Sequence, residues 1–395
     1  MSTAPQRVRG ISRRAERLPA QAIREVMELA WAQPDAIHLE VGEPDFPTPE
    51  HVVEAAARAA REGHTRYTPN AGIPALREAL ADKVGRVNGH AASADQVVVS
   101  AGGVEAIHAT LTTLADPGDE VLLPDPAWPD FVQMTALLGT PARFYHQTAD
   151  TDYLPDIAEL EELVGERTRV LVLNSPSNPL GAVIPARRLV ELVEFAERHD
   201  LWVISDECYD EINFDGDFVS TMAAAPSPRV VSIYSFSKVY AMTGWRIGYA
   251  VAPPEVAAAL TRLQEPIISC VNAPTQRAAL AAVTGPQDVV ASMRDAYRER
   301  RDRALDVLRG GGLPVVTPKG AFYLWVDIGR AGIRSDQFVR ELIAQRGVAA
   351  APGTAFGAAG DSYLRISLAS HLDQLLEGSR RLIEQVETSA AGATR

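Results

Sequence analysis

The stretch that decides the fold runs from residue 230 to residue 251 and reads VVSIYSFSKVYAMTGWRIGYAV. Its two ends, Val230–Tyr234 and Ile247–Val251, are largely apolar, as in strands that are buried on both faces. Between them lie Lys238, which follows two serines, and Arg246 eight residues later. A lysine amine can form a Schiff base with an aldehyde, while a hydroxyl and a guanidinium can hold a phosphate. The stretch therefore fits pyridoxal 5′-phosphate (PLP); a buried lysine stem beside a surface arginine is the alternative.

Further apolar runs precede this stretch and alternate with amphipathic helices. The predicted strands are 96–100, 120–123, 169–174 and 201–205. Strands that are almost continuously apolar need helices on both faces of their sheet. This part of the chain is therefore predicted to be an α/β domain with a mainly parallel sheet sandwiched by helices.

The pattern changes after residue 284. A charged helix at 293–308 leads to short strands at 322–326 and 363–368 that alternate with helices, which is typical of a smaller α+β domain. We expect the N-terminal segment to join this domain. The expected division is 1–46 as an N-terminal arm and part of the small domain, 47–289 as the large PLP-binding domain, and 290–395 as the small C-terminal domain.

The composition restricts the partners and the compartment. A net charge of −13 over 395 residues disfavours nucleic acid, because phosphate contacts need lysine and arginine. No apolar run approaches the length that spans a bilayer, and the first residues lack the apolar region of a signal peptide. The two cysteines, Cys208 and Cys270, fit a reducing interior. We therefore expect a cytoplasmic protein without a nucleic-acid, membrane or metal partner.

Polar residues follow the predicted strands, where α/β sheets bind their ligands. Gly102 and Gly103 follow the strand at 96–100 and could offer backbone N–H groups to an anion, or form a simple turn. Asn178 follows the strand at 169–174. Its side chain could donate to a phenolate oxygen, or form an Asx turn.

Asp206 directly follows the strand at 201–205, where a buried carboxylate is costly unless it has a cationic partner. A protonated pyridine nitrogen would be such a partner, and the aspartate would keep it charged; a helix N-cap is the alternative. Tyr209 could hydrogen-bond the ring hydroxyl or merely pack. Trp128 could stack on the ring or fill the core. Together these residues predict a PLP site.

On these residues and on longer motifs, the chain resembles the class I and II aminotransferases, which are PLP enzymes of the aspartate aminotransferase fold (fold type I). The resemblance covers nearly the whole length. Its motifs are LEVGEPDF at 39–46, YTPNAG at 67–72, NSPSNPLG at 174–181, SDECY at 205–209, the stretch 235–249 and RIS at 365–367. It implies that the protein moves an amino group between an L-amino acid and a 2-oxo acid by ping-pong chemistry.

The resemblance also implies a role for each residue of the site. Lys238 would form the Schiff base and later shuttle the proton, while Asp206 would pair with the pyridinium. Asn178 and Tyr209 would contact the ring oxygen, and Trp128 would stack on the ring. The residues that would hold the phosphate are Gly102, Gly103, Ser235 and Arg246. Those that would contact the substrate are Gly42, Trp128, Asn178 and Arg365. Arg365 would clamp the α-carboxylate with its two-pronged guanidinium.

Tyr67 would reach the phosphate of a neighbouring subunit in such an enzyme. This role implies a homodimer with shared active sites. Without the motif at 67–72, the same residue is most simply a tyrosine of a surface loop.

One departure from the family concerns the substrate. Aspartate-specific members of the most similar subgroup carry a lysine directly after the glycine pair, where it reaches the distal carboxylate of the substrate. This chain has Val104 at that position. Val104, Trp128 and Phe131 therefore favour an apolar or aromatic side chain over a dicarboxylic one, although Val104 could equally face the core.

The same fold hosts other functions. A carbon–sulfur β-lyase, a decarboxylase or an oxidase would share the PLP contacts, and substrate geometry alone would distinguish them. A PLP-sensing transcriptional regulator would need a DNA-binding domain, which we do not expect, because fewer than 40 residues precede the motif at 39–46 and the chain is acidic. Residues 19–23 are candidates for a loop that closes over the site.

Overall fold

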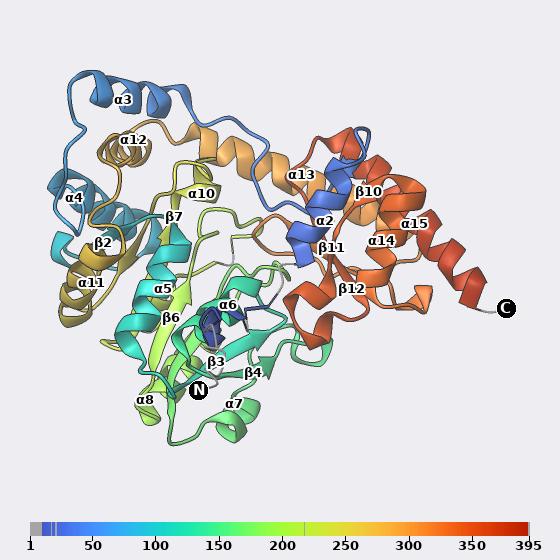
Figure 1. Cartoon of the computed structure of the whole chain (residues 1–395), viewed down its shortest axis with the longest axis horizontal. Coiled ribbons are helices and arrows are strands. Elements are labelled where there is room, and N and C mark those ends of the chain that lie inside the picture. Colours follow the sequence, from blue (N-terminus) through green and yellow to red (C-terminus); the bar gives the residue numbers. More distant parts are fainter. Residues whose placement is uncertain (1–9, 17, 20–21, 217, 394–395) are drawn as a thin grey trace, which may run out of the picture.

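The computed structural model describes residues 10–16, 18–19, 22–216 and 218–393. Within these residues, the central sheet has seven strands in the order β2-β8-β7-β6-β5-β3-β4 (Figure 1). They are β2 (Val97–Ser100), β3 (Glu120–Asp125), β4 (Ala142–His146), β5 (Thr168–Asn174), β6 (Trp202–Asp206), β7 (Val230–Ser235) and β8 (Gly248–Val251). Neighbouring strands are parallel except β8, which runs antiparallel to β2 and β7. The predicted α/β fold with a mainly parallel sheet is confirmed.

The direction of β8 follows from the short connection before it. Residues 236–247 join β7 to β8 and contain only the one-turn helix α10 (Phe236–Val239). A parallel neighbour normally needs a crossover with a full helix, so the chain returns antiparallel instead. This tight return places Lys238, on α10, directly beyond the carboxyl end of β7.

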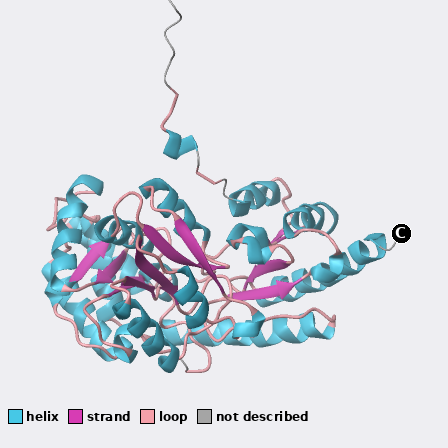
Figure 2. Cartoon of the chain, turned by 90° about the horizontal axis from the view of Figure 1, so that it is seen from below, coloured by secondary structure: helices cyan, strands magenta, loops and turns pink. Residues whose placement is uncertain are grey.

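Helices cover both faces of the central sheet (Figures 1 and 2). Val97 and Val99 pack with α3, α4 and α12, whereas Val98 packs on the other face with α5, α6 and α11, because successive strand residues point to opposite faces. These helices are α3 (Glu50–Arg61), α4 (Pro74–Lys83), α5 (Gly103–Leu114), α6 (Pro129–Leu138), α11 (Pro254–Ile267) and α12 (Ala273–Thr284), joined by α7 (Ile157–Leu163), α8 (Ala186–Arg198) and α9 (Thr221–Ala224).

A second sheet is built by the C-terminal part of the chain. Its strands β11 (Ala351–Pro352), β12 (Tyr363–Ser367) and β9 (Tyr323–Asp327) are antiparallel. Nearby, β1 (Ile37–His38) pairs in parallel with β10 (Val348–Ala349). The associated helices are α2 (Ala22–Trp31), α13 (Asp288–Gly310), α14 (Ser335–Arg346) and α15 (Leu372–Ala393), whereas the one-turn helix α1 (Arg13–Glu16) contacts α6.

The N-terminal segment shares a hydrophobic core with this second sheet. Val26 and Leu39 are buried in the same cluster as Phe338 and Leu342 of α14. We propose on this basis that residues 22–46 and 290–393 form one small domain beside the large domain 47–289; residues 1–9 of the expected N-terminal arm lie outside the described residues. The second boundary falls inside the first turn of α13.

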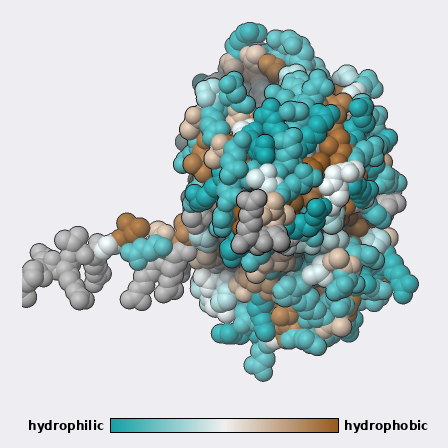
Figure 3. Space-filling model, turned by 90° about the vertical axis from the view of Figure 1, so that its right-hand side faces the viewer, coloured by the Kyte–Doolittle hydropathy of each residue, from teal (hydrophilic) through white to brown (hydrophobic). Residues whose placement is uncertain are grey.

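Polar side chains dominate one face of the molecule. Figure 3 shows this face, which is formed by the C-terminal helices. Among the described residues, no helix combines the length and the apolar character that crossing a membrane requires.

Candidate active site

A cavity of about 430 Å³ lies beyond the carboxyl ends of β5, β6 and β7 and brings together most of the predicted site residues. Those that line it are Gly42, Gly103, Trp128, Asn178, Asp206, Tyr209, Ser235, Lys238, Arg246 and Arg365. Parallel strands end at the same edge of a sheet, which explains why residues that are far apart in sequence meet here.

Lys238 extends from α10 into the cavity. Its Nζ donates to the carbonyl oxygen of Gly42 at 2.5 Å and lies 5.9 Å from the centre of the Phe322 ring. Removal from water lowers the pKa of Lys238 to about 8, and the guanidinium groups of Arg365 and Arg246 act in the same direction. Near neutral pH the neutral amine, which is the form that attacks a carbonyl, is therefore far more populated than for an exposed lysine.

Asp206 ends β6 at the same edge of the sheet. Its Oδ1 accepts a hydrogen bond from the backbone N–H of Cys208 at 3.1 Å. Burial raises the pKa of Asp206 to about 6, so a cation beside it would be strongly favoured. The chain continues from Asp206 into a turn, so the alternative of a helix N-cap is wrong.

A cradle suited to an anion lies at the start of α5. Gly102 has a φ of +92°, and a Cβ there would lie 2.6 Å from Arg246 Nη2, so glycine lets the guanidinium approach the backbone. Gly103 begins α5, whose first backbone N–H groups have no partner within the helix. The hydroxyls of Ser235 and Ser237 complete the cradle; sequence reasoning had given Ser237 no role.

Arg365 reaches the cavity from β12. Its Nη1 donates to Asn178 Oδ1 at 3.0 Å, and its Nη2 donates to the carbonyl oxygen of Glu40 at 2.5 Å. The buried Nε has no hydrogen-bond partner among the described residues. A buried unsatisfied donor is costly, so a carboxylate bound here would relieve it. The amide oxygen of Asn178 is therefore directed at Arg365.

Tyr209 and Gly42 are connected by a residue that the sequence did not reveal. The hydroxyls of Tyr209 and Tyr323 lie 2.8 Å apart, and Tyr323 lines the cavity. A Cβ on Gly42 would collide with the Tyr323 hydroxyl, which explains the glycine. Tyr323 belongs to an apolar run that sequence reasoning could identify only as a strand.

Two expectations about the substrate wall have different outcomes. Val104 is 39% exposed and lines the cavity, so it does not face the core. Phe131 is fully buried and is absent from the lining formed by the described residues, so its expected place in the wall is wrong. The reason is that α6 turns Phe131 inwards, edge-on against Trp128, with ring centres 5.3 Å apart. Trp128 both lines the cavity and packs on the core.

Most of the side chains at the open end of the cavity were not predicted. Ile23, Arg24 and Met27 of α2 line it together with Asp130 of α6. The helical periodicity of α2 is visible in the sequence, but the element that it faces is not. Of the predicted closing loop, residues 20–21 lie outside the described residues, whereas Ile23 contributes to the lining.

Tyr67 lies outside this cavity within the described chain. Its side chain is 89% exposed. Its position is thus on the molecular surface, where a second subunit could be reached.

The residues present fit PLP. The cavity holds an amine for the aldehyde, a cradle for the phosphate and a buried carboxylate for the pyridine nitrogen. Its volume lies within the range of pockets that bind small cofactors.

Comparisons with known proteins agree with this chemistry. The sequence model of the family "Aminotransferase class I and II" matches residues 34–381. The chain is 37% identical to the aspartate/prephenate aminotransferase of Thermus thermophilus, covering 95% of this chain and 98% of that protein. It is 36% identical to aromatic-amino-acid aminotransferase 2 of Thermococcus litoralis, with 94% and 97% covered.

A solved structure shows the same likeness in three dimensions. The aspartate aminotransferase of Thermus thermophilus with maleate superposes with a TM-score of 0.91 at 36% identity, covering 96% of this chain and 100% of that chain. The protein is thus a PLP-dependent enzyme that transfers amino groups. The chain belongs to the class I and II aminotransferases.

Proposed function

We propose that this aminotransferase acts on amino acids with an apolar or aromatic side chain, and that Lys238 moves the proton in both half-reactions. The observation that carries the proposal is the composition of one cavity. It combines the Lys238 amine and the Asp206 carboxylate with a wall formed by Val104 and Trp128.

Lys238 and Asp206 would have complementary tasks. Bound PLP supplies an aldehyde that captures the amino group and a protonated ring that withdraws electrons from the α-carbon. The Asp206 carboxylate would hold the proton on the ring nitrogen. The pKa of the Lys238 amine is lowered to about 8. This amine would remove the α-proton of the substrate and return it to the cofactor carbon that carried the aldehyde.

Arg365 would orient the substrate through its α-carboxylate. Support comes from its burial, its unpartnered Nε and its hydrogen bond to Asn178. Asn178 and Tyr209 would contact the ring oxygen of the cofactor. Trp128 would stack on the ring.

The cofactor phosphate would be bound at the start of α5. We assign this role to the backbone of Gly102 and Gly103, the hydroxyl of Ser235 and the guanidinium of Arg246. The Ser237 hydroxyl is an additional candidate, because it lines the same part of the cavity.

The lining of the open end supports an apolar or aromatic substrate. Val104, Ile23 and Met27 offer apolar surface, and the carboxyl group of Asp130 would repel a second carboxylate on the substrate. Arg24, on the same rim, favours the competing possibility of a dicarboxylic substrate. The relatives are named as aspartate/prephenate and as aromatic-amino-acid aminotransferases, so their names do not distinguish the two substrate classes. We therefore base the proposed substrate class on the residues that line the cavity.

A substrate panel tests this proposal. The purified holoenzyme is mixed with each amino acid alone, and conversion of the cofactor to pyridoxamine phosphate is followed by absorbance. We expect aromatic and large aliphatic amino acids to react at least about tenfold faster than aspartate and glutamate. Reaction with aspartate and glutamate alone would reject the proposal. Release of ammonia and pyruvate from a cysteine conjugate would favour a β-lyase instead.

We also propose a homodimer in the cytoplasm. The exposure of Tyr67 supports a contact with a neighbouring subunit, and the two free cysteines, Cys208 and Cys270, fit a reducing compartment. Sedimentation of the holoenzyme tests the assembly, and a monomer at micromolar concentration would contradict it.

A further inference from the structure

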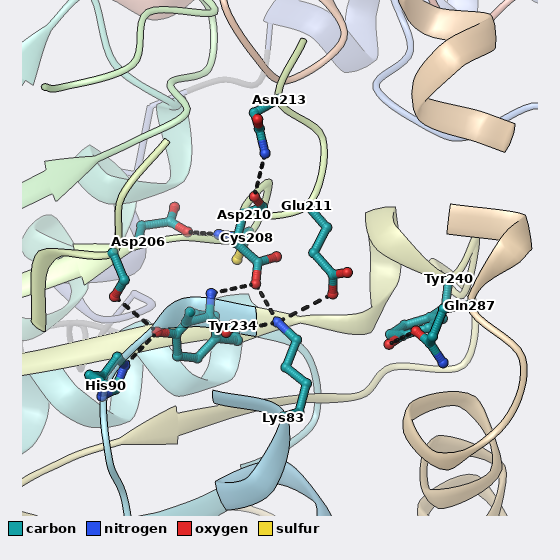
Figure 4. A network of polar contacts seen from close by, with 12 residues as sticks. Lys83, His90, Asp206, Cys208, Asp210, Glu211, Asn213, Tyr234, Tyr240 and Gln287 are labelled. Carbon is teal, nitrogen blue, oxygen red and sulfur yellow. Dashed lines mark hydrogen bonds and ion pairs between the residues drawn. The ribbon is translucent and has the colours of Figure 1, made fainter. Parts of the chain in front are cut away.

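A second cluster of buried charges lies behind the cavity wall. We call Lys83, Asn88, Asp210 and Glu211 the Lys83 cluster (Figure 4). Lys83 Nζ donates to Asp210 Oδ2 and, at 3.0 Å, to Asn88 Oδ1, and it lies 3.3 Å from Glu211 Oε1. Asn88 Nδ2 also donates to Asp210 Oδ2, at 2.9 Å. Asp210 is thus held by two donors from the same segment.

The electrostatics of the cluster keep Lys83 charged. Burial alone would lower the pKa of Lys83, but the carboxylates of Asp210 and Glu211 outweigh it and raise the pKa well above its ordinary value. Only 4% of Lys83 is exposed. A charge in this position is costly to bury and is tolerated only with partners that are fixed in place.

The cluster connects two segments that build the active site. Asp210 lies in the turn 208–211, which begins two residues after Asp206 and also contains Tyr209. On the other side, Lys83 Nζ lies 5.2 Å from the ring centre of Tyr234, the residue before Ser235. Figure 4 shows Lys83 pointing at Asp210 and Glu211, with Asp206 and Cys208 on the same segment.

The segment that supplies Lys83 and Asn88 is itself irregular. Lys83 ends α4, and residues Val84–Asn88 continue as a π-helix. Such widened turns are rare and frequently occur at functional sites. Here the π-helix ends at Asn88, whose side chain reaches both Lys83 and Asp210.

We propose that Lys83 is a positioning residue for the reaction: through Asp210 it fixes the turn that follows Asp206 and presents Tyr209 to the cofactor. The proposal rests on the roles proposed above for these two residues. Lys83 is absent from the cavity lining formed by the described residues, so it would act through the turn and not by touching the substrate.

The first test uses Lys83→Met in the holoenzyme, since methionine keeps much of the side chain and removes the charge. A displaced Tyr209 would no longer stabilise the ring oxygen, so the pH at which the lysine-bound cofactor changes its absorbance should rise by about half a unit or more. We expect kcat to fall about tenfold with little change in KM, as for other residues that orient catalytic groups.

Three further variants and one double variant test whether Lys83 acts through Asp210. Asp210→Asn should shift the absorbance midpoint in the same direction, and the double variant should be no worse than Lys83→Met, because both changes break one connection. Lys83→Arg keeps the charge and should recover most of kcat. Arg301→Met is the matched control, because Arg301 is also a buried cation but pairs with Asp215 and Asp302.

The outcomes separate a positioning role from a merely structural one. If Lys83→Met and Arg301→Met both lower the melting temperature and neither moves the midpoint or kcat, the proposal is rejected. Should Lys83→Met not fold, Asn88→Ala replaces it; it removes one donor to Asp210 and should give a smaller shift of the same sign. A wild-type midpoint in both Asn88→Ala and Asp210→Asn would then reject the proposal. The substrate panel on the wild-type enzyme tests the proposed function independently of these variants.

Discussion

The inner and outer ends of the cavity are built in different ways. Asp206, Ser235 and Lys238 lie at or just beyond the ends of two neighbouring strands, whose hydrogen-bonded register fixes their spacing. Ile23 and Asp130 come from α2 and α6, whose places depend on side-chain packing. Rigid strand ends suit groups that must hold the cofactor in one geometry. Side chains on the helices, by contrast, can be substituted without disturbing the sheet. We therefore expect substitutions at the inner end to affect the chemistry and those at the outer end to affect the choice of substrate.

The largest effect is expected from Lys238→Ala at the inner end. Loss of the amine removes both the covalent anchor and the group that moves the proton, so turnover should fall by at least about 10⁴-fold. The absorbance of the lysine-bound cofactor should disappear, although PLP could still bind without a covalent bond. Absorbance spectra and single-turnover kinetics measure these effects, and a variant that keeps wild-type turnover would end the assignment.

Asp206→Asn should come next, because it keeps the shape and removes the charge that holds the ring proton. We expect kcat/KM to fall by about 10²-fold. In the wild-type protein without cofactor, Asp206 has its pKa raised to about 6 by burial. The bound cation would lower that pKa, so the affinity for PLP should weaken as pH falls through about 6. Asp206→Asn should lack this dependence.

Glu207→Gln is the matched control for this pH dependence. Glu207 is the next residue and equally buried, and burial raises its pKa to about 7. Its Oε1 accepts from the Thr221 backbone and the Ser205 hydroxyl, away from the cavity. PLP titrations across pH 5–8 should therefore match the wild type for Glu207→Gln. The same loss of pH dependence in both variants would show that Asp206 is not the titrating group.

At the outer end, Val104→Lys should change selectivity and leave the chemistry intact. An ammonium group in the wall should raise kcat/KM for aspartate about tenfold and lower it for phenylalanine, since it would pair with a second carboxylate. Val104→Met adds length without charge and should not favour aspartate. If Val104→Lys leaves the ratio of the two substrates unchanged, the substrate side chain does not lie beside residue 104.

The same contrast explains what the sequence could predict. Asp206 and Lys238 could be located because apolar strands are recognisable and the residues that follow them must share one edge. An amine and a carboxylate at that edge then indicated PLP as the ligand. The direction of β8 was not anticipated, because it depends on the length and shape of the connection after β7.

The helices at the outer end were harder to interpret. Periodicity identifies a helix and its apolar face, but it does not say which residue turns towards a cavity and which towards the core. Phe131 and Asp130 are neighbours in sequence, yet the first is buried in the core and the second lines the cavity. The role proposed for Lys83 was equally hidden, because its partner Asp210 is 127 residues away in the chain.

The smallest effect is expected from Tyr67→Phe, which extends the comparison to a surface outside the cavity. Within one chain the Tyr67 side chain is 89% exposed, so the loss of its hydroxyl should leave the stability of a single subunit unchanged. If that hydroxyl donates to the phosphate in a neighbouring subunit, the dissociation constant for PLP should rise roughly fivefold or more, because hydrogen bonds to charged groups are among the stronger ones. Equilibrium titration with PLP at two protein concentrations measures this change. An unchanged constant would place Tyr67 outside the site and remove the main support for shared active sites.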